Sequence, residues 1–123
     1  MSTLVYVGWI VKAKMSINAE TGKFHSLQRI LDDYDDLTPA QEAVSEKFKP
    51  VEFAYSSTAD KGYEILTNVN EYCNWIDCDE ESIIIFDAPP ERKRPTQDWI
   101  DLLKGTMMYE SIEVKFAQIV VVL

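Results

Sequence analysis

Residues 3–17 alternate between apolar and other side chains, and this pattern limits the possible folds more than any other part of the chain does. Every second position from Val5 to Ile17 is apolar. A period of two is the period of a β-strand, so the pattern predicts a strand along the whole segment. The first half is apolar on its second face as well: Leu4, Tyr6 and Ile10. Such a run is expected of a central strand that is covered on both faces.

Three further segments predict strands. Residues 112–123 end in the run Ile-Val-Val-Val-Leu, which is typical of a strand buried on both faces. Residues 82–86 form an apolar run of strand length, and residues 51–56 alternate over a shorter stretch.

Two helices are predicted between the first and second strands. After a turn at residues 18–22, apolar residues recur at helical spacing: Phe24, Leu27, Ile30, Leu31 and Tyr34. A second helix begins with a capping box, in which Thr38 is the N-cap, Pro39 the first helical residue and Gln41 the third. Pro50 marks its end.

A third and a fourth helix are predicted further along the chain. Thr58 can cap a helix whose apolar face holds over about four turns: Tyr63, Leu66, Val69, Tyr72, Cys73 and Ile76. A hairpin through residues 60–62 is the competing interpretation of this stretch. Thr96 caps a short fourth helix that carries Trp99 and ends at Gly105.

These elements follow one another in the order β-α-α-β-α-β-α-β within a single globular domain, residues 1–123. Because 46% of the residues are hydrophobic, the chain can bury a core without a disulfide or a metal. We therefore predict a layered α/β (or α+β) domain with a four-stranded mixed or parallel sheet and about four helices.

The negative charge is concentrated in the middle of the chain. Residues 32–81 contain 14 of the 21 Asp and Glu residues but only 3 of the 12 Lys and Arg residues. A field of this sign attracts basic partners and repels phosphate backbones and anionic lipids. We expect a basic protein partner, such as a nuclease or another nucleic-acid-binding protein, and we expect neither direct nucleic-acid binding nor membrane binding.

Two acidic clusters lie close to predicted helix C-termini, where the helix dipole disfavours negative charge. The first cluster surrounds an aromatic residue: Asp32, Asp33, Tyr34, Asp35 and Asp36. The second follows an off-face tryptophan: Trp75, Asp77, Asp79, Glu80 and Glu81. Charge placed against the dipole suggests a recognition surface, with Tyr34 and Trp75 as aromatic anchors. A solvated face that maintains solubility is the alternative for each cluster.

One basic run stands out in this acidic chain. It consists of Arg92, Lys93 and Arg94, in a loop stiffened by three prolines. The loop has no glycine and therefore does not resemble a phosphate site. A solvated loop, or an ion pair with the acidic segment within or between subunits, is its expected role.

No sequence motif indicates catalysis, a cofactor or a metal site. The chain lacks the glycine-rich and nucleophile-elbow motifs of known enzyme classes, and we expect its single histidine, His25, to be an ordinary surface or half-buried residue. Cys73 and Cys78 do not have zinc or redox spacing, so we expect two reduced thiols. With no signal peptide and no long apolar run, we expect a cytoplasmic protein.

The leading hypothesis is a non-enzymatic, acidic inhibitor of phage or bacterial type. It would bind a basic, nucleic-acid-handling protein by presenting carboxylates where phosphates lie, as a nucleic-acid mimic does. The alternative is a small self-associating structural or accessory domain, a homodimer formed through the last strand and the basic loop. A small carboxylate-based enzyme is the third hypothesis, and it requires a pocket that holds at least two acids.

Overall fold

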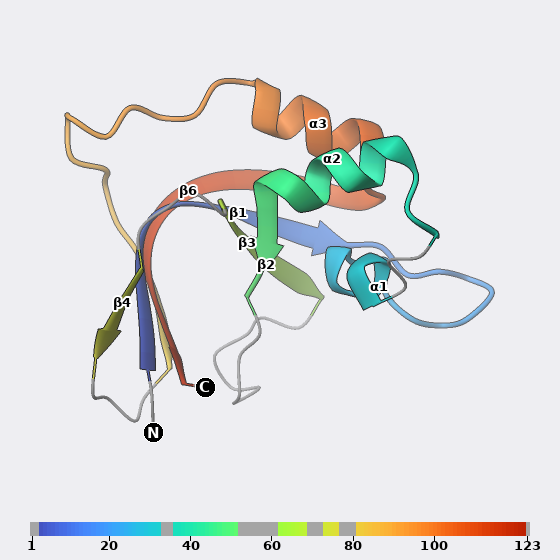
Figure 1. Ribbon diagram of the computed structural model, residues 1–123, viewed down its shortest axis with the longest axis horizontal. Helices are drawn as coiled ribbons and strands as arrows, with labels where there is room; N and C mark the ends of the chain where they lie inside the picture. Colours follow the sequence, from blue (N-terminus) through green and yellow to red (C-terminus); the bar gives the residue numbers. More distant parts are fainter. Residues whose placement is uncertain (1–2, 33–35, 52–61, 69–72, 77–80, 123) are drawn as a thin grey trace.

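In the computed structural model, the described residues are 3–32, 36–51, 62–68, 73–76 and 81–122, with the backbone alone for residues 3, 4, 73–76 and 122. This part of the chain forms six strands and three helices (Figure 1). In chain order they are β1 (Thr3–Met15), α1 (Leu27–Asp32), α2 (Pro39–Lys47), β2 (Phe48–Pro50), β3 (Tyr63–Asn68), β4 (Cys73–Ile76), β5 (Ser82–Ile85), α3 (Asp98–Thr106) and β6 (Tyr109–Val122).

A long antiparallel pair, β1 with β6, forms the centre of the sheet. The pairing runs from Thr3 opposite Val122 to Met15 opposite Tyr109, with one irregularity after Lys14. On its other edge, β1 pairs first with β4 and then, further along, with β3. Because β2 pairs with β3 and β5 pairs with β6, the strand order is β2-β3-β1-β6-β5, and every pair is antiparallel.

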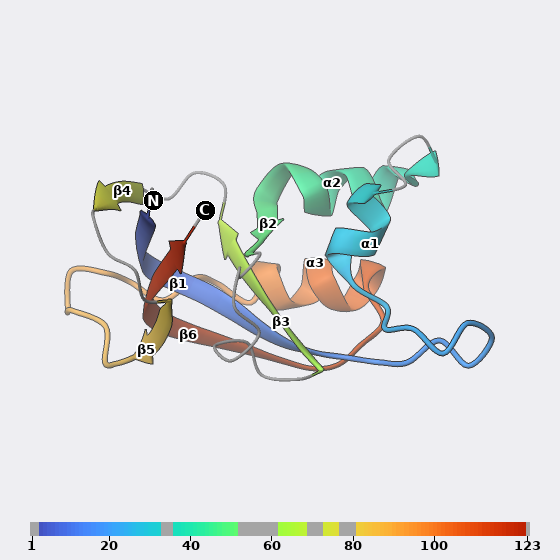
Figure 2. The same cartoon turned by 90° about the horizontal axis from the view of Figure 1, so that it is seen from below.

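The three helices gather beside one half of this bent sheet, next to the end of β1 and the start of β6 (Figures 1 and 2). Side chains from the helices and the sheet form the larger apolar cluster: Val11, Ala13, Leu27, Val44, Phe48, Leu66, Trp99, Leu103, Met107 and Val114. Trp99 meets the ring of Phe48 edge to face at 5.2 Å between centroids, which links α3 to the start of β2. The helices therefore cover only one face.

A smaller apolar cluster lies on the opposite face of the sheet. It contains Tyr6, Ile10, Ile65, Ala117, Ile119 and Val121. Residues 10 and 11 of β1, and residues 65 and 66 of β3, belong to different clusters, as expected when successive strand residues point to opposite faces. The two-sided apolar pattern of the first strand is thus explained by two separate clusters.

The predicted fold class is wrong. In the described part of the chain the sheet is antiparallel throughout rather than mixed or parallel with four strands, and three helices are present rather than about four. The described order is β-α-α-β-β-β-β-α-β. β2 and β3 follow one another with no described helix between them and pair as antiparallel strands. The other antiparallel pairs join β1 to β3, β4 and β6, and β6 to β5.

The helix predicted from Thr58 to Ile76 is also wrong, because its described residues form β3 and β4. Leu66 faces the helices and Ile65 faces the other side, so the apolar residues follow a period of two within β3. Gly62 precedes β3 with a φ of 84°, a conformation that favours glycine and starts the strand from a turn. The edge of β1 that does not face β6 favours strands over a helix here, since pairing with β3 and β4 satisfies backbone amides and carbonyls of β1 that a helix would leave unpaired.

The remaining predictions are confirmed in part. The first and last strands and the strand at residues 82–85 are present. The capping box of α2 is complete, because Thr38 accepts from the amide of Gln41 and the Gln41 side chain accepts from the amide of Thr38. The short strand occupies residues 48–50, and residues 52–56 lie outside the described part. Gln97, not Thr96, is the N-cap of α3, and its side chain makes no capping bond.

None of the helices among the described residues combines the length and the apolar character that crossing a membrane requires.

Replacing Leu66 with alanine tests the packing of β3 against the helices. Leu66 is fully buried, so Leu66→Ala should lower the free energy of unfolding by about 2–5 kcal/mol through lost burial and a residual cavity. Urea unfolding measures this change, with the exposed Glu46→Ala variant as a control that should stay within about 0.5 kcal/mol of the parent. A change in Leu66→Ala no larger than in the control would contradict the register of β3.

Candidate functional site

A hairpin extends from the end of β1 and projects beyond the sheet (Figures 1 and 2). Its two sides are joined by the Ile17–Phe24 bridge and by a hydrogen bond from the His25 amide to the Ser16 carbonyl, 2.8 Å. The turn is closed by paired bonds between Asn18 and residues 22 and 23, and Gly22 has a φ of 69°. The sequence Asn-Ala-Glu-Thr-Gly supplies the residues that such a turn needs.

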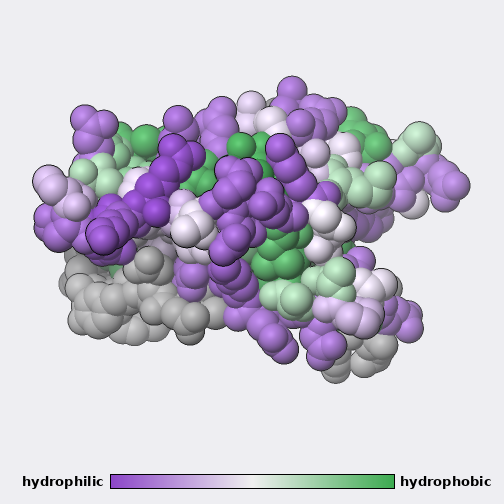
Figure 3. Space-filling model, turned by 90° about the horizontal axis from the view of Figure 1, so that it is seen from above, coloured by the Kyte–Doolittle hydropathy of each residue, from purple (hydrophilic) through white to green (hydrophobic). Residues whose placement is uncertain are grey.

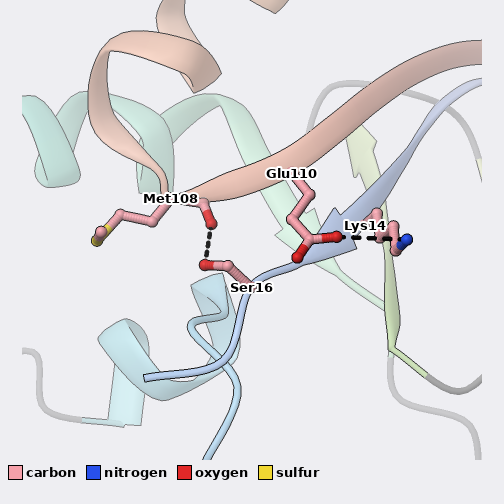
Figure 4. A network of polar contacts seen from close by, with 4 residues as sticks. All are labelled: Lys14, Ser16, Met108 and Glu110. Atoms are coloured by element: carbon pink, nitrogen blue, oxygen red, sulfur yellow. Dashed lines mark hydrogen bonds and ion pairs between the residues drawn. The ribbon is translucent and has the colours of Figure 1, made fainter. Parts of the chain in front are cut away.

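The base of the hairpin is fixed to the start of β6. The Ser16 hydroxyl donates to the Met108 carbonyl at 2.5 Å, and Lys14 Nζ lies 3.3 Å from Glu110 Oε2 (Figure 4). The Met108 side chain points away from this hydrogen bond (Figure 4). The ion pair is solvent-exposed and contributes little, so the hydrogen bond and the strand pairing hold the hairpin in place.

Three large apolar side chains are exposed at this end of the molecule. Ile17 is 60% exposed, Phe24 is 40% exposed and Met108 is 64% exposed. Ile17 pairs with Phe24 in the bridge, and Phe24 and Met108 line the same cavity. Together with the exposed Asp36, we call these residues the hairpin-end surface. Clustered exposed apolar groups with a polar rim are typical of interaction sites.

A cavity of about 360 Å³ opens beside the hairpin-end surface. Segments far apart in the sequence form its wall: the hairpin, α1, the start of α2 and the junction of α3 with β6. Its charged and titratable lining residues are His25, Arg29 and Asp36. Its apolar lining residues are Phe24, Ile30, Leu37, Met107 and Met108. The cavity is therefore mixed in character, with opposite charges over an apolar wall.

A buried carboxylate positions the helix that forms one wall of this cavity. Glu64 on β3 is 8% exposed and accepts hydrogen bonds from the backbone amides of Leu27 (2.8 Å) and Gln28 (3.1 Å) at the start of α1. The Tyr109 hydroxyl donates a third bond to the same carboxylate at 2.5 Å. Ser26 adds a bond to the amide of Arg29. These bonds fix the orientation of α1 on the sheet.

The Tyr109 hydroxyl is strongly affected by this environment. Burial, and then the negative charge of Glu64, raise the pKa of Tyr109 far above its ordinary value of 10.0. The neutral phenol is the form that donates to Glu64, so the folded protein holds its proton. This network is structural, and it contributes by keeping Ser26 and Arg29 in place at the cavity.

The structure describes part of the first acidic cluster. Asp32 is exposed at the end of α1 and accepts from the Gln28 amide group at 3.0 Å. Asp36 is exposed and lines the cavity. The other members, Asp33, Tyr34 and Asp35, lie outside the described residues.

The second acidic cluster is described less fully. Trp75 lies in β4, where its backbone pairs with Leu4, and its side chain is not among those described. Asp77, Asp79 and Glu80 lie outside the described residues. Glu81 is 8% exposed and lines a second cavity of about 390 Å³ on the sheet face opposite the helices. In this arrangement Glu81 adds little to any exposed acidic surface.

The basic loop divides into one held residue and two exposed ones. Arg92 lies 5.3 Å from the centre of the Phe116 ring, and its guanidinium comes close to Gly8, where a Cβ atom would meet it at 3.2 Å. Lys93 and Arg94 are exposed. Arg92 therefore packs against β1 and β6, and it also contributes to the positive charge of the basic loop.

The sequence did not single out the residues that the structure brings together at this end. The sequence pattern places Ile17 on the inner face of a strand and Phe24 on that of a helix, and it gives no signal for Met108. The available signal was an apolar residue on each side of the six residues 18–23, which contain the turn residues Asn18 and Gly22, since this pattern indicates a hairpin rather than two separate elements.

Neither cavity described here brings two described carboxylates together, because Asp36 lines one and Glu81 lines the other. The described residues likewise contain no group of three or more His, Cys, Asp or Glu side chains placed to hold a metal ion.

Comparison with known proteins adds no family. No protein-family model matches the chain, and no significant match was found among curated proteins or among solved structures.

Replacing Tyr109 with phenylalanine tests the Glu64 network. At neutral pH, Tyr109→Phe should lower the free energy of unfolding by about 1.5–3 kcal/mol, the usual range for a hydrogen bond to a charged group. Because folding raises the pKa of Tyr109, the stabilisation is intact below the unfolded value of 10.0 and decreases as the pH rises above it.

The difference between parent and variant should therefore narrow above about pH 10 in urea unfolding measured over a series of pH values. The Tyr63→Phe variant is the control, because the Tyr63 ring faces Lys12 and not Glu64. A difference between parent and Tyr109→Phe that grows with pH would show that the network is assigned wrongly.

Proposed function

We propose that the protein is an acidic, non-enzymatic binding protein of the cytoplasm. It engages a basic protein through the hairpin-end surface and through the exposed carboxylates of its helices. The partner class is a nuclease or another nucleic-acid-binding protein, whose anionic-ligand site the carboxylates occupy. The single observation that carries the proposal is that exposed Phe24, Met108 and Asp36 line one cavity, with exposed Ile17 paired to Phe24 at its edge.

Charge supports this proposal. The described residues of the helices and of the α1–α2 connection expose six carboxylates: Asp32, Asp36, Glu42, Glu46, Asp98 and Asp101. The same segments carry three cationic side chains: Arg29, Lys47 and Lys104. None of the six carboxylates lies within ion-pair distance of a described cationic group. Hydrophilic side chains also cover most of the helix-bearing face (Figure 3).

The two kinds of group have different roles in such a complex. Exposed carboxylates attract a basic partner over distances comparable to the screening length and raise the association rate. Apolar side chains that become buried slow dissociation and supply affinity. Phe24 and Met108 are suited to the second role because their side chains are exposed, while the hydrogen bond from Ser16 to the Met108 carbonyl fixes the backbone at the base of the hairpin.

The non-enzymatic part of the proposal rests on the separation of the acids. A carboxylate-based hydrolytic or proton-transfer site needs two acids that share one pocket. Asp36 and Glu81 line different cavities, on different sides of the sheet.

Charge reversal at the acidic side tests the proposal. Immobilised protein is used to capture basic proteins from a bacterial lysate, and association is then measured with each purified partner. The double variant Asp32→Lys/Asp36→Lys should slow association at low ionic strength by about tenfold or more, because steering depends on charge. Phe24→Ser should instead speed dissociation.

The matched control is Asp87→Lys/Glu91→Lys, the same charge change at exposed positions after β5. It should leave association closer to the parent rate, and all variants should keep the parent urea midpoint. If the purified partner binds nucleic acid, the complex should no longer do so. Capture of no basic protein, or equal slowing by the control, would reject the proposal.

Self-association is the second candidate function, and β5 is the observation that favours it. Ile84 and Ile85 are 52% and 49% exposed, and Phe86 beside them is 41% exposed. Among the described residues β5 pairs only with β6, so it forms an edge of the sheet, and it contains no charged residue or proline. Edges of this kind can pair with the same edge of a second copy. β5 covers residues 117–120 of β6, so along this stretch β5 rather than the last strand would be shared.

Sedimentation at several salt concentrations tests this second function. Ile84→Lys should shift a dimer toward monomer, because a lysine on an edge strand opposes edge pairing. Ile17→Lys is the matched control, since it places the same charge at an exposed isoleucine of the hairpin. A protein that remains monomeric at high concentration, or a dimer equally weakened by both variants, would exclude pairing through β5.

A further inference from the structure

The cavity beside the hairpin has a feature that binding of a basic protein does not require. Arg29 and Asp36, with opposite charges, line the same cavity of about 360 Å³. Neither side chain forms an ion pair with the other or with a further described residue. A basic partner needs Asp36 but gains nothing from Arg29, so this pair of charges points to a different occupant.

Each charge selects a group on the ligand. A guanidinium such as that of Arg29 binds a carboxylate through two parallel hydrogen bonds. The carboxylate of Asp36 binds an ammonium group. A ligand that satisfies both must carry both charges, which describes a zwitterion. The half-buried His25 and the Gln41 amide line the same cavity and can donate further hydrogen bonds.

The apolar lining selects the remainder of the ligand. Met107 is 6% exposed and belongs to the main apolar cluster, so it forms a fixed wall. Ile30 and Leu37 line the cavity with it, and Met108 lies at its exposed side. Methionine side chains adapt to ligands of different shape. This lining suits an aliphatic or aromatic side chain.

Size and charge oppose other ligand classes. The volume is at the lower end of the range of small-molecule sites, about 300–1,000 Å³, which disfavours a nucleotide. One guanidinium beside a carboxylate disfavours a polyphosphate. Arg29 lines the cavity with its one described carboxylate, and this positive charge disfavours a divalent cation such as calcium or magnesium.

We infer that this cavity binds a free α-amino acid with an apolar side chain. Arg29 holds the ligand carboxylate, Asp36 holds its ammonium group, and the wall formed by Ile30, Leu37 and Met107 contacts its side chain. This site shares Phe24, Met108 and Asp36 with the hairpin-end surface, but the inference does not rest on partner binding.

Calorimetry with matched ligands tests the inference. The probes are L-leucine, L-methionine and L-phenylalanine, together with two leucine analogues: 3-methylbutylamine, which lacks the carboxylate, and 4-methylpentanoate, which lacks the ammonium group. At least one amino acid should bind, and each leucine analogue should bind about tenfold or more weakly than leucine, since each loses a charge-assisted contact.

Variants assign the two contacts. Arg29→Gln should weaken binding of leucine and of 4-methylpentanoate but leave 3-methylbutylamine unchanged, whereas Asp36→Asn should show the reverse pattern with the two analogues. Arg94→Gln and Asp87→Asn make the same charge changes away from the cavity and should leave leucine binding unchanged. Urea midpoints equal to the parent value show that the variants are folded.

Three results would overturn the inference: no binding of any amino acid at millimolar concentration, equal binding of leucine and its analogues, or equal losses in the site and control variants. None of these results bears on the capture of a basic protein, which is measured without added ligand. Failure of this inference is therefore distinguishable from failure of the proposed function.

Discussion

The antiparallel pairing of β1 with β6 is the interaction on which the rest of the structure depends. It joins the two ends of the chain along nearly the full length of both strands, from Thr3 opposite Val122 to Met15 opposite Tyr109. Three strands attach directly to this pair: β3 and β4 to the free edge of β1, and β5 to part of the free edge of β6. β2 joins the sheet through β3. The pair also separates the two apolar clusters, which lie on its opposite faces. Because its partners are far apart in sequence, the pair closes a long loop on folding, and its contacts must outweigh that entropy.

A single buried carboxylate connects this central pair to the helices. Glu64 lies opposite Ala13 in the sheet, receives the first amides of α1 and accepts from Tyr109 at the start of β6. A carboxylate in this position would be costly to bury alone, but three hydrogen bonds compensate its lost hydration. The geometry of the cavity follows from this network, since Ser26 and Arg29 belong to the segment that Glu64 holds. The buried carboxylate of Glu64 thus holds the residues that line the exposed cavity.

The sequence predicted the elements whose local signals agree with their tertiary environment. The alternation after Thr3 and the capping box at Thr38 are both present in the structure. Residues 63–76 could not be assigned in this way, because their apolar spacing fits a helix and also fits a strand, and only the open edge of β1 decides between them. The candidate site was predicted in part. Asp32 and Asp36 were recognised from charge, whereas Phe24 and Met108 are 84 residues apart in the sequence and meet only through the β1–β6 register.

The hairpin and β5 lie at opposite ends of the molecule, and they depend on charge in opposite ways (Figures 1 and 2). With a formal net charge of −9, two copies of this chain repel each other. Salt screens that repulsion and therefore favours pairing of uncharged β5 edges, while the same screening weakens attraction of a basic partner to the helices. At low ionic strength the charge on the chain would thus favour the proposed basic partner over a second copy. The concentration of acids on the helices, and their scarcity on β5, would keep these two proposed interactions separate.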